Sequence, residues 1–286
     1  MKAKTIKKVL RAKVDEWLAT LEDGSVRSAA ESATIITGGA IASMLVNEPV
    51  NDYDIYFRDQ ETARRVAEYY VARFPHGGIK VSVEPDRVRI VTENGYRGAT
   101  AGDVQTLQDA GEIEDTYEDT EALALTAEDA KPKYRPVFMS TNAITLSNKV
   151  QIVLRFYGEP DAIHENYDFV HCMNYWTSWQ GDLVLRQPAL ESLLAKELRY
   201  VGSKYPVCSV MRLRKFIKRG WSVNAGQILK MMMQVSALDL LDQKVLEDQL
   251  TGVDSAYFLQ IMARIKEKDP EKVNAAYLVE IIDRMF

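Results

Sequence analysis

Apolar and polar residues follow two different spacings along this chain, and the spacing changes near residue 160. Before that point, short runs rich in Val, Ile, Tyr and Phe alternate with longer segments whose apolar residues recur every three or four positions. Runs of the first kind are typical of strands, and segments of the second kind are typical of amphipathic helices. The strands expected from this pattern are residues 34–37, 53–57, 79–84, 86–91, 136–146 and 149–156.

Helical spacing opens and closes the chain. The first 25 residues predict an amphipathic helix for which Gly24 is a natural C-cap, and residues 26–33 predict a second, shorter helix. Past Gly158 and Pro160 the pattern is helical to the last residue. The apolar stripes in that region cover residues 188–201, 207–220, 225–241, 255–268 and 273–286.

These patterns predict an α+β fold followed by an all-helical domain. Residues 30–160 are expected to form a mixed sheet with flanking helices, and residues 1–29 are expected to pack on it. Residues 161–286 form the predicted helical part. Residues 102–133 are strongly acidic and weakly periodic, which indicates a peripheral insertion in the first domain.

Composition narrows the class of protein. The chain has 286 residues, of which 47% are hydrophobic and 27% charged, as expected for a folded protein with a sizeable core. Cys172 and Cys208 are far apart and form no CxxC pair, so we expect neither a disulfide framework nor a zinc site, and a cytoplasmic location fits best. No apolar run approaches the roughly 18 residues of a membrane span, and the N-terminus lacks the features of a signal peptide.

The stretch TIITGGAIASMLVNEPVNDYDIYF, from Thr34 to Phe57, carries the clearest candidate chemistry. Gly38 and Gly39 stand between a predicted strand and a predicted helix, where backbone N–H groups can approach a phosphate closely. Ser43, one turn into that helix, adds a hydroxyl. Asp52 and Asp54 are two residues apart, so on a strand both carboxylates face the same side and can bind hard cations such as Mg²⁺.

Simpler interpretations of the same stretch exist. A Gly-Gly pair alone is usually a tight turn, and an isolated Asp-x-Asp is more often surface than site. A calcium loop is poorly supported because Tyr56 stands where an oxygen ligand belongs. A dinucleotide-binding turn lacks its third glycine. The order strand, Gly-Gly, helix, Asp-x-Asp, strand is less common by chance, and it favours a phosphate-and-metal site.

This stretch resembles the signature of the polymerase-β-type nucleotidyltransferase superfamily, and the order of parts resembles class II tRNA nucleotidyltransferases and bacterial poly(A) polymerases. It also resembles nucleotidyltransferase-like proteins of tailed phages. Asp168 and Phe169, in ENYDFVHCMNYW, match an Asp-Phe pair of that group, and residues 205–221 resemble its Arg-rich neck helix. The resemblance implies binding of a nucleoside triphosphate (NTP) with Mg²⁺ or Mn²⁺, and transfer of a nucleoside monophosphate by two-metal chemistry to a hydroxyl, with an RNA or tRNA end as the expected acceptor.

Two departures from that group bear on activity. The superfamily places a third carboxylate on a later strand, and the matching position in this chain is Gln151, whose amide can ligate a metal but is not a strong base. Glu84 replaces the missing carboxylate only if its strand lies beside residues 53–57. Asn166 and Tyr167 stand where the group has two arginines. The alternative is therefore a catalytically inactive protein of this fold with a structural or interaction role.

Positive charge concentrates in the predicted neck although the net charge of the chain is −5. Arg212 and Lys215 fall near one face of a helix, where they suit a triphosphate or a nucleic-acid backbone. Asp168 is expected to contact the nucleotide, to cap a helix or to pair with Arg212. The other interpretation of this basic cluster is a solvated helix face that pairs with the acidic insertion. The full cluster is Lys196, Arg199, Lys204, Arg212, Arg214, Lys215, Lys218 and Arg219.

Overall fold

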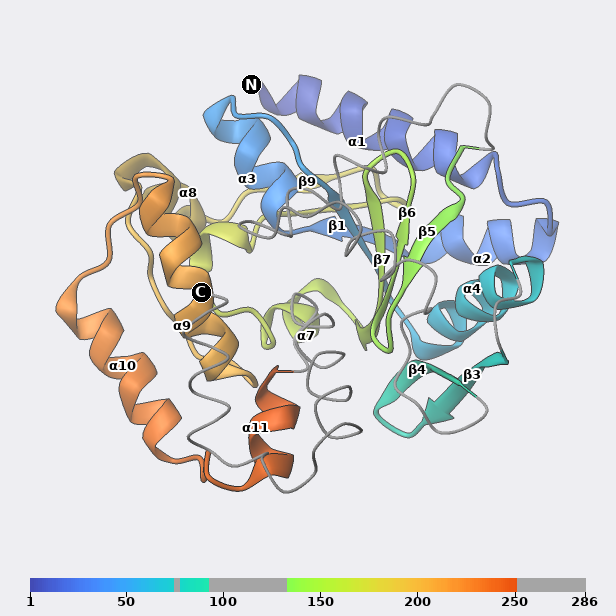
Figure 1. Ribbon diagram of the computed structural model, residues 1–286. Coiled ribbons are helices and arrows are strands. Elements are labelled where there is room, and N and C mark those ends of the chain that lie inside the picture. Colours follow the sequence, from blue (N-terminus) through green and yellow to red (C-terminus); the bar gives the residue numbers. More distant parts are fainter. Residues whose placement is uncertain (75–77, 93–132, 251–286) are drawn as a thin grey trace, which may run out of the picture.

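A mixed seven-stranded sheet forms the centre of the molecule in the computed structural model, which describes residues 1–74, 78–92 and 133–250 (Figure 1). The strand order is β5-β6-β7-β2-β1-β8-β9, in which β2 and β7 are parallel and every other neighbouring pair is antiparallel. The strands are β1 (Thr34–Thr37), β2 (Tyr53–Phe57), β5 (Pro136–Met139), β6 (Ala143–Leu146), β7 (Val150–Tyr157), β8 (Tyr175–Thr177) and β9 (Leu183–Val184).

The main core lies between one face of this sheet and the helices α1 (Ala3–Leu18), α2 (Gly24–Ala33) and α4 (Gln60–Arg73). In α1 the apolar residues fall at helical spacing and are fully buried, and Trp17 donates a hydrogen bond of 2.9 Å to the hydroxyl of Tyr70 in α4. The N-terminal helix is therefore part of the core.

The prediction that Gly24 caps the end of the first helix is wrong. Helix α1 ends at Leu18, and Gly24 is the first residue of α2. Asp23 is the N-cap of α2, because its side chain accepts hydrogen bonds from the N–H groups of Ser25 and Val26.

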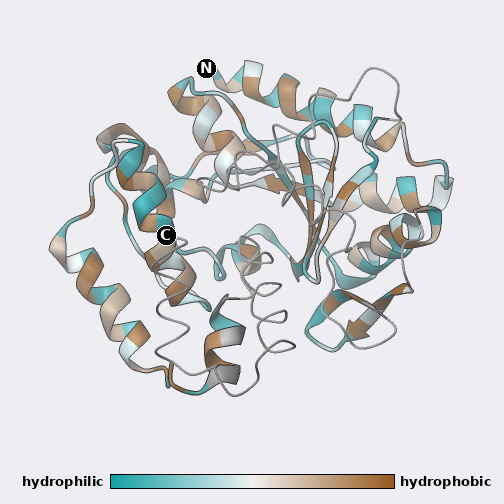
Figure 2. Cartoon of the chain, viewed as in Figure 1, coloured by the Kyte–Doolittle hydropathy of each residue, from teal (hydrophilic) through white to brown (hydrophobic). Residues whose placement is uncertain are grey.

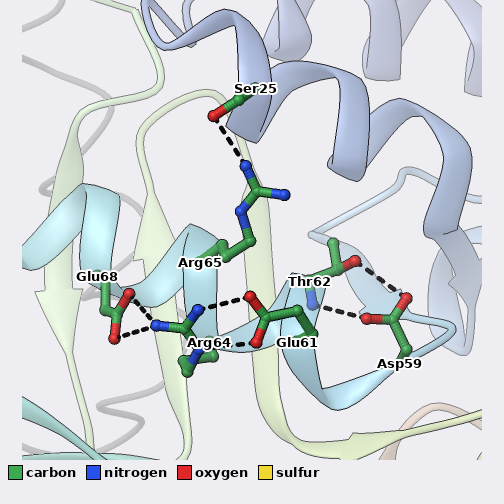
Figure 3. Close-up of polar contacts among 7 residues, drawn as sticks. All are labelled: Ser25, Asp59, Glu61, Thr62, Arg64, Arg65 and Glu68. Carbon is green, nitrogen blue, oxygen red and sulfur yellow. Dashed lines mark hydrogen bonds and ion pairs between the residues drawn. The ribbon is translucent and has the colours of Figure 1, made fainter.

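Polar contacts fix the outer side of these helices (Figure 3). Asp59 caps α4 by accepting from the backbone N–H of Thr62 at 2.7 Å, and Arg65 reaches across to the hydroxyl of Ser25 in α2 at 2.8 Å. Arg64 is bound on both sides by the carboxylates of its helical neighbours, Glu61 and Glu68. Arg64 therefore binds side chains of its own helix, whereas Arg65 links α4 to α2.

On the opposite face of the sheet, the short helix α7 (Pro160–His164) packs against β7. Ile35, Tyr56, Val153 and Ile163 form a small cluster there, with Ile163 coming from α7. Figure 1 shows α9, α10 and α11 gathered on one side of the molecule, away from α2 and α4. The remaining helices are α3 (Gly39–Val46), the 3-10 helix η2 (Val170–Cys172), α8 (Gln187–Ala195), α9 (Pro206–Lys218), α10 (Ala225–Ser236) and α11 (Gln243–Leu250).

The fold class matches the prediction, with one correction to the expected extent of the sheet. The region after residue 160 is not wholly helical, because β8 and β9 extend the sheet beyond β1, and Trp176 of β8 pairs with Ile36. These strands have three and two residues, which is too short for an alternating pattern to be recognised. The acidic segment 102–132 and the apolar stripes at 255–268 and 273–286 lie outside the described residues.

A second, smaller sheet and an exposed helix complete the described structure. The hairpin of β3 (Ile79–Glu84) and β4 (Arg87–Thr92) pairs only within itself in the part of the chain that is described, and it lies beside α4. In Figure 2, α10 is apolar over much of its length, and its Leu229, Met232 and Met233 are 57%, 61% and 66% exposed. Among the described helices, none has the length and apolarity needed to cross a membrane.

Candidate functional site

The turn after β1 brings the chain into contact with a carboxylate of β2. Gly38 has a φ of +95°, a value that favours glycine, and its N–H donates to the carbonyl of Cys172 at 3.0 Å. A Cβ atom at this position would lie only 2.9 Å from Oδ2 of Asp54. At Gly39, the first residue of α3, a Cβ would meet nothing within 4 Å. The turn therefore presents the N-terminus of α3 to open space directly beside Asp54.

Asp54 lies on the face of β2 that points away from the main core. Its neighbours Tyr53 and Ile55 point into that core, whereas Asp54 and Tyr56 alternate to the other side. Asp52 immediately precedes the strand, and both carboxylates are half-buried. Asp54 therefore lies in the middle of the sheet next to the Gly38 turn, and Asp52 directly precedes the same strand.

Gln151 is the register partner of Asp54 across the parallel pair of β2 and β7. Register partners on parallel strands point to the same face, so the amide stands where the third carboxylate was sought. Glu84, the other candidate, lies in the separate β3–β4 hairpin and pairs with Arg87 at 2.7 Å and Arg89 at 3.2 Å. Glu84 is thus excluded as a replacement, because its strand does not lie beside β2.

Asp168 and Arg212 form an ion pair that joins the second half of the chain to this site. Nη1 of Arg212 lies 2.6 Å from Oδ2 of Asp168, and the side chains are 30% and 14% exposed. Of the three expectations for Asp168, the structure contains the pairing with Arg212. Lys215 follows one turn later on α9 and is exposed, while Ser43 is half-buried one turn into α3.

Cys172 links these groups electrostatically. Burial raises the pKa of its thiol, and the negative charges of Asp168, Asp54 and Asp52 raise it further, whereas Arg212 lowers it. The same charges therefore act on one thiol, which places the ion pair and the two aspartates in one neighbourhood. At neutral pH this thiol is protonated and adds no charge to the site.

Two tyrosines beside Asp54 were not predicted as site residues. Burial, with the negative charge of Asp54 among the further causes, raises the pKa of both Tyr56 and Tyr167, so both phenols stay neutral. The buried hydroxyl of Tyr167 lies 3.5 Å from the place where a Cβ on Gly38 would stand. For Tyr56 the signal in the sequence was its position two residues after Asp54, which puts it on the same face of a strand. For Tyr167 the signal was its position where the resembled group has an arginine. Cys172 carries no such signal, since a tertiary contact brings it to the Gly38 turn.

The side-chain oxygens at this place suit a hard cation, but they include two carboxylates where the resemblance implied three. These oxygens belong to the carboxylates of Asp52 and Asp54 and the amide of Gln151. Within residues 1–74, 78–92 and 133–250, no group of three or more His, Cys, Asp or Glu side chains is arranged to hold a metal ion.

Comparison with known proteins gives a family and a set of structural neighbours. Residues 8–196, a range that includes Gly38, Asp52, Asp54 and Gln151 but not Arg212, match the model of the family described as Gabija anti-defense 2 family protein. The Gabija anti-defense 2 protein of Bacillus phage SPbetaL7 is 19% identical over 253 residues, which cover 88% of this chain and 49% of the relative. The chain therefore spans about half the length of that relative.

The solved structures that are similar to this chain include two CCA-adding enzymes. The Thermotoga maritima enzyme in complex with tRNA is 13% identical with a TM-score of 0.40, and the match covers 90% of this chain and 56% of the enzyme. The Bacillus stearothermophilus enzyme in complex with CTP is 13% identical with a TM-score of 0.36, covering 81% and 47%. With the family match extending over most of the chain, this protein belongs to the Gabija anti-defense 2 family.

Proposed function

We propose that this protein is a phage-encoded counter-defence nucleotidyltransferase that acts in the cytoplasm of an infected cell. It binds an NTP with Mg²⁺ or Mn²⁺ and transfers the nucleoside monophosphate to a hydroxyl acceptor, and this activity opposes the Gabija defence named in its family. The observation that carries the proposal is the contact between the Gly38 turn and Asp54, where a Cβ would lie 2.9 Å from the carboxylate. This contact supports the proposal because it puts the turn proposed to bind phosphate next to the proposed cation ligand.

The binding half of the site follows from its parts. The N–H groups at the start of α3 and the positive end of its dipole suit the triphosphate, with the Ser43 hydroxyl one turn further on. Asp52 and Asp54 hold the cation that accompanies the triphosphate. Arg212 and Lys215 of α9 supply positive charge, and Asp168 keeps Arg212 in place through the 2.6 Å ion pair.

In the transfer step, an acceptor hydroxyl oxygen forms a bond to the α-phosphorus of the NTP. The bond from that phosphorus to the oxygen bridging the α- and β-phosphates breaks, and pyrophosphate leaves. The hydroxyl proton passes to a carboxylate of the aspartate pair or to solvent. Following the sequence resemblance, we propose an RNA or tRNA end as the acceptor, and a hydroxyl on a host protein is the second acceptor class to test.

The experiment is a transfer assay with labelled NTPs, Mg²⁺ or Mn²⁺, and either total RNA or a host protein extract. The wild-type chain should label one of these pools, and Asp52→Asn and Asp54→Asn should each abolish the label. Asp86→Asn is the matched control, because Asp86 is 66% exposed in the β3–β4 turn. In cells that carry the Gabija defence, the same two site variants should fail to restore phage plating, whereas Asp86→Asn should restore it fully.

Gln151 favours a second candidate, a protein that binds the nucleotide without transferring it. In that case Mg²⁺ and NTP raise the melting temperature of the wild-type chain but not of Asp54→Asn, and no acceptor is labelled. A purely structural role is distinguished by the cell assay: Asp52→Asn and Asp54→Asn would then protect phage as well as the wild type does. That result would overturn both nucleotide-based proposals.

A further inference from the structure

The two aspartates stand among neutral groups. Gln151, the register partner of Asp54, carries an amide. Tyr56, Tyr167 and Cys172 carry phenol and thiol groups, which ordinarily keep their protons at neutral pH. Among the described residues that surround the pair, these groups therefore add no negative charge to that of the aspartates.

The remaining charges around the pair balance each other. Asp168 and Arg212 are bound to one another at 2.6 Å, so their combined charge is zero. Glu84, the other carboxylate considered for this position, is bound to Arg87 and Arg89 in a different sheet. Among the described residues considered for this position, the carboxylates that remain as cation ligands are those of Asp52 and Asp54.

From this charge balance we infer that the site takes a single divalent cation together with the triphosphate, and that Gln151 is the residue that prevents tight binding of a second. The inference rests on the proposed NTP site and refines it. It departs from the two-metal chemistry that the sequence resemblance implied.

Electrostatics explains why the amide matters. Two divalent cations in a joint site are about 3.5–4 Å apart and repel each other strongly, so each needs carboxylates that neutralise it. An amide oxygen ligates a cation as a dipole but carries no net charge. One cation is neutralised by the two aspartates and shared with the phosphates. A second cation would depend on the phosphates and the Gln151 amide.

The test is a count of bound Mn²⁺ on the full-length chain. Free Mn²⁺ is titrated by electron paramagnetic resonance in the presence of saturating α,β-methylene ATP, which cannot transfer its nucleotide, and a nucleotide-only blank is subtracted. We expect one tightly bound Mn²⁺ per wild-type chain. Gln151→Glu should bind two, since the glutamate supplies the missing charge. Gln151→Asn, the matched neutral variant, should bind one.

The outcomes separate this inference from the proposed function. Two tightly bound Mn²⁺ ions on the wild-type chain would overturn the single-cation inference but would still support an NTP site. Because this count uses the wild-type chain, it tests the inference even if a variant fails to fold. A folded Gln151→Glu that still binds one would overturn the role of Gln151. No Mn²⁺ beyond the nucleotide-only blank on the wild type, or an equal count on Asp54→Asn, would instead overturn the proposed NTP site.

Discussion

Gly38 is the residue on which the geometry of the site depends most directly. Its backbone has a φ of +95°, and the carboxylate of Asp54 occupies the space into which a side chain would project. The positive φ disfavours residues with a side chain because their backbone would be strained. The Asp54 carboxylate disfavours them because a Cβ atom would overlap with it. Gly39 shares neither constraint, since its φ is not positive and nothing lies within 4 Å of its Cβ position.

Gly38→Ala should therefore lower the free energy of unfolding by about 1–3 kcal/mol. It should also weaken NTP binding by about tenfold or more, because a displaced Asp54 carboxylate costs at least about 1.4 kcal/mol of binding free energy. Gly39→Ala, at the adjacent position, should change stability by less than about 1 kcal/mol and leave binding intact. Denaturant titration and calorimetric NTP titration measure the two effects. Equal losses in both variants would contradict the special role of Gly38.

At the scale of elements, the contact between η2 and α9 contains a buried histidine. The ring of His171 lies 4.8 Å from that of Phe216 on α9 and 4.5 Å from that of Trp221 just beyond it, measured between centroids. Burial lowers the pKa of His171 to about 4, although the carboxylate of Asp168 acts in the opposite direction. The folded protein therefore holds this ring neutral at a pH at which the unfolded chain protonates it.

This contact should make stability depend on pH. Because the unfolded histidine has a pKa of 6.5 and the folded one about 4, the unfolded state binds the extra proton between these values, and stability is lost as pH falls through that window. From pH 7 to pH 5 the loss due to His171 is about 2 kcal/mol. His171→Phe should remove this part of the loss in denaturant titrations at the two pH values. An unchanged difference between pH 7 and pH 5 would show that His171 does not contribute.

The ion pair between Asp168 and Arg212 is the second link from α9 to the site. A double-mutant cycle with Asp168→Asn and Arg212→Gln should give a coupling free energy of about 1–3 kcal/mol, because the pair is largely removed from solvent. The control is the pair of Arg199 and Glu191, whose distance is 2.8 Å but whose side chains are 37% and 46% exposed. Its coupling should lie below about 1 kcal/mol. Similar values for the two pairs would contradict the argument from burial.

At the scale of the whole molecule, local patterns predicted the sheet and the centre of the site, whereas long-range contacts escaped prediction. Strands at 34–37 and 53–57, and the position of Gln151 beside Asp54, followed from apolar runs and from the resemblance. The short strands β8 and β9 did not, because their pairing depends on β1 and not on their own periodicity. The placement of Cys172 and Tyr167 also did not follow from local patterns, because tertiary contacts bring both residues to the Gly38 turn.

The main core is continuous from α1 to β8, so the N-terminal helix and the sheet should unfold together. Ile6 and Trp17 of α1 belong to the same buried cluster as Ile55 of β2 and Trp176 of β8. Trp17 is fully buried and donates to the hydroxyl of Tyr70 at 2.9 Å. Its removal leaves a large cavity and a buried hydroxyl without this partner.

Trp17→Ala should lower the free energy of unfolding by about 3–5 kcal/mol. Trp17→Phe should lower it by less, because phenylalanine keeps most of the packing and loses only the hydrogen bond and part of the ring. Leu194→Ala is the control, since Leu194 is 87% exposed on α8 and its truncation should change stability by about 0.5 kcal/mol or less. Chemical denaturation followed by far-ultraviolet circular dichroism measures all three. If the N-terminal helix did not share the core of the sheet, Trp17→Ala would lower the free energy of unfolding no more than Leu194→Ala does. That result would contradict a single core that unfolds as one unit.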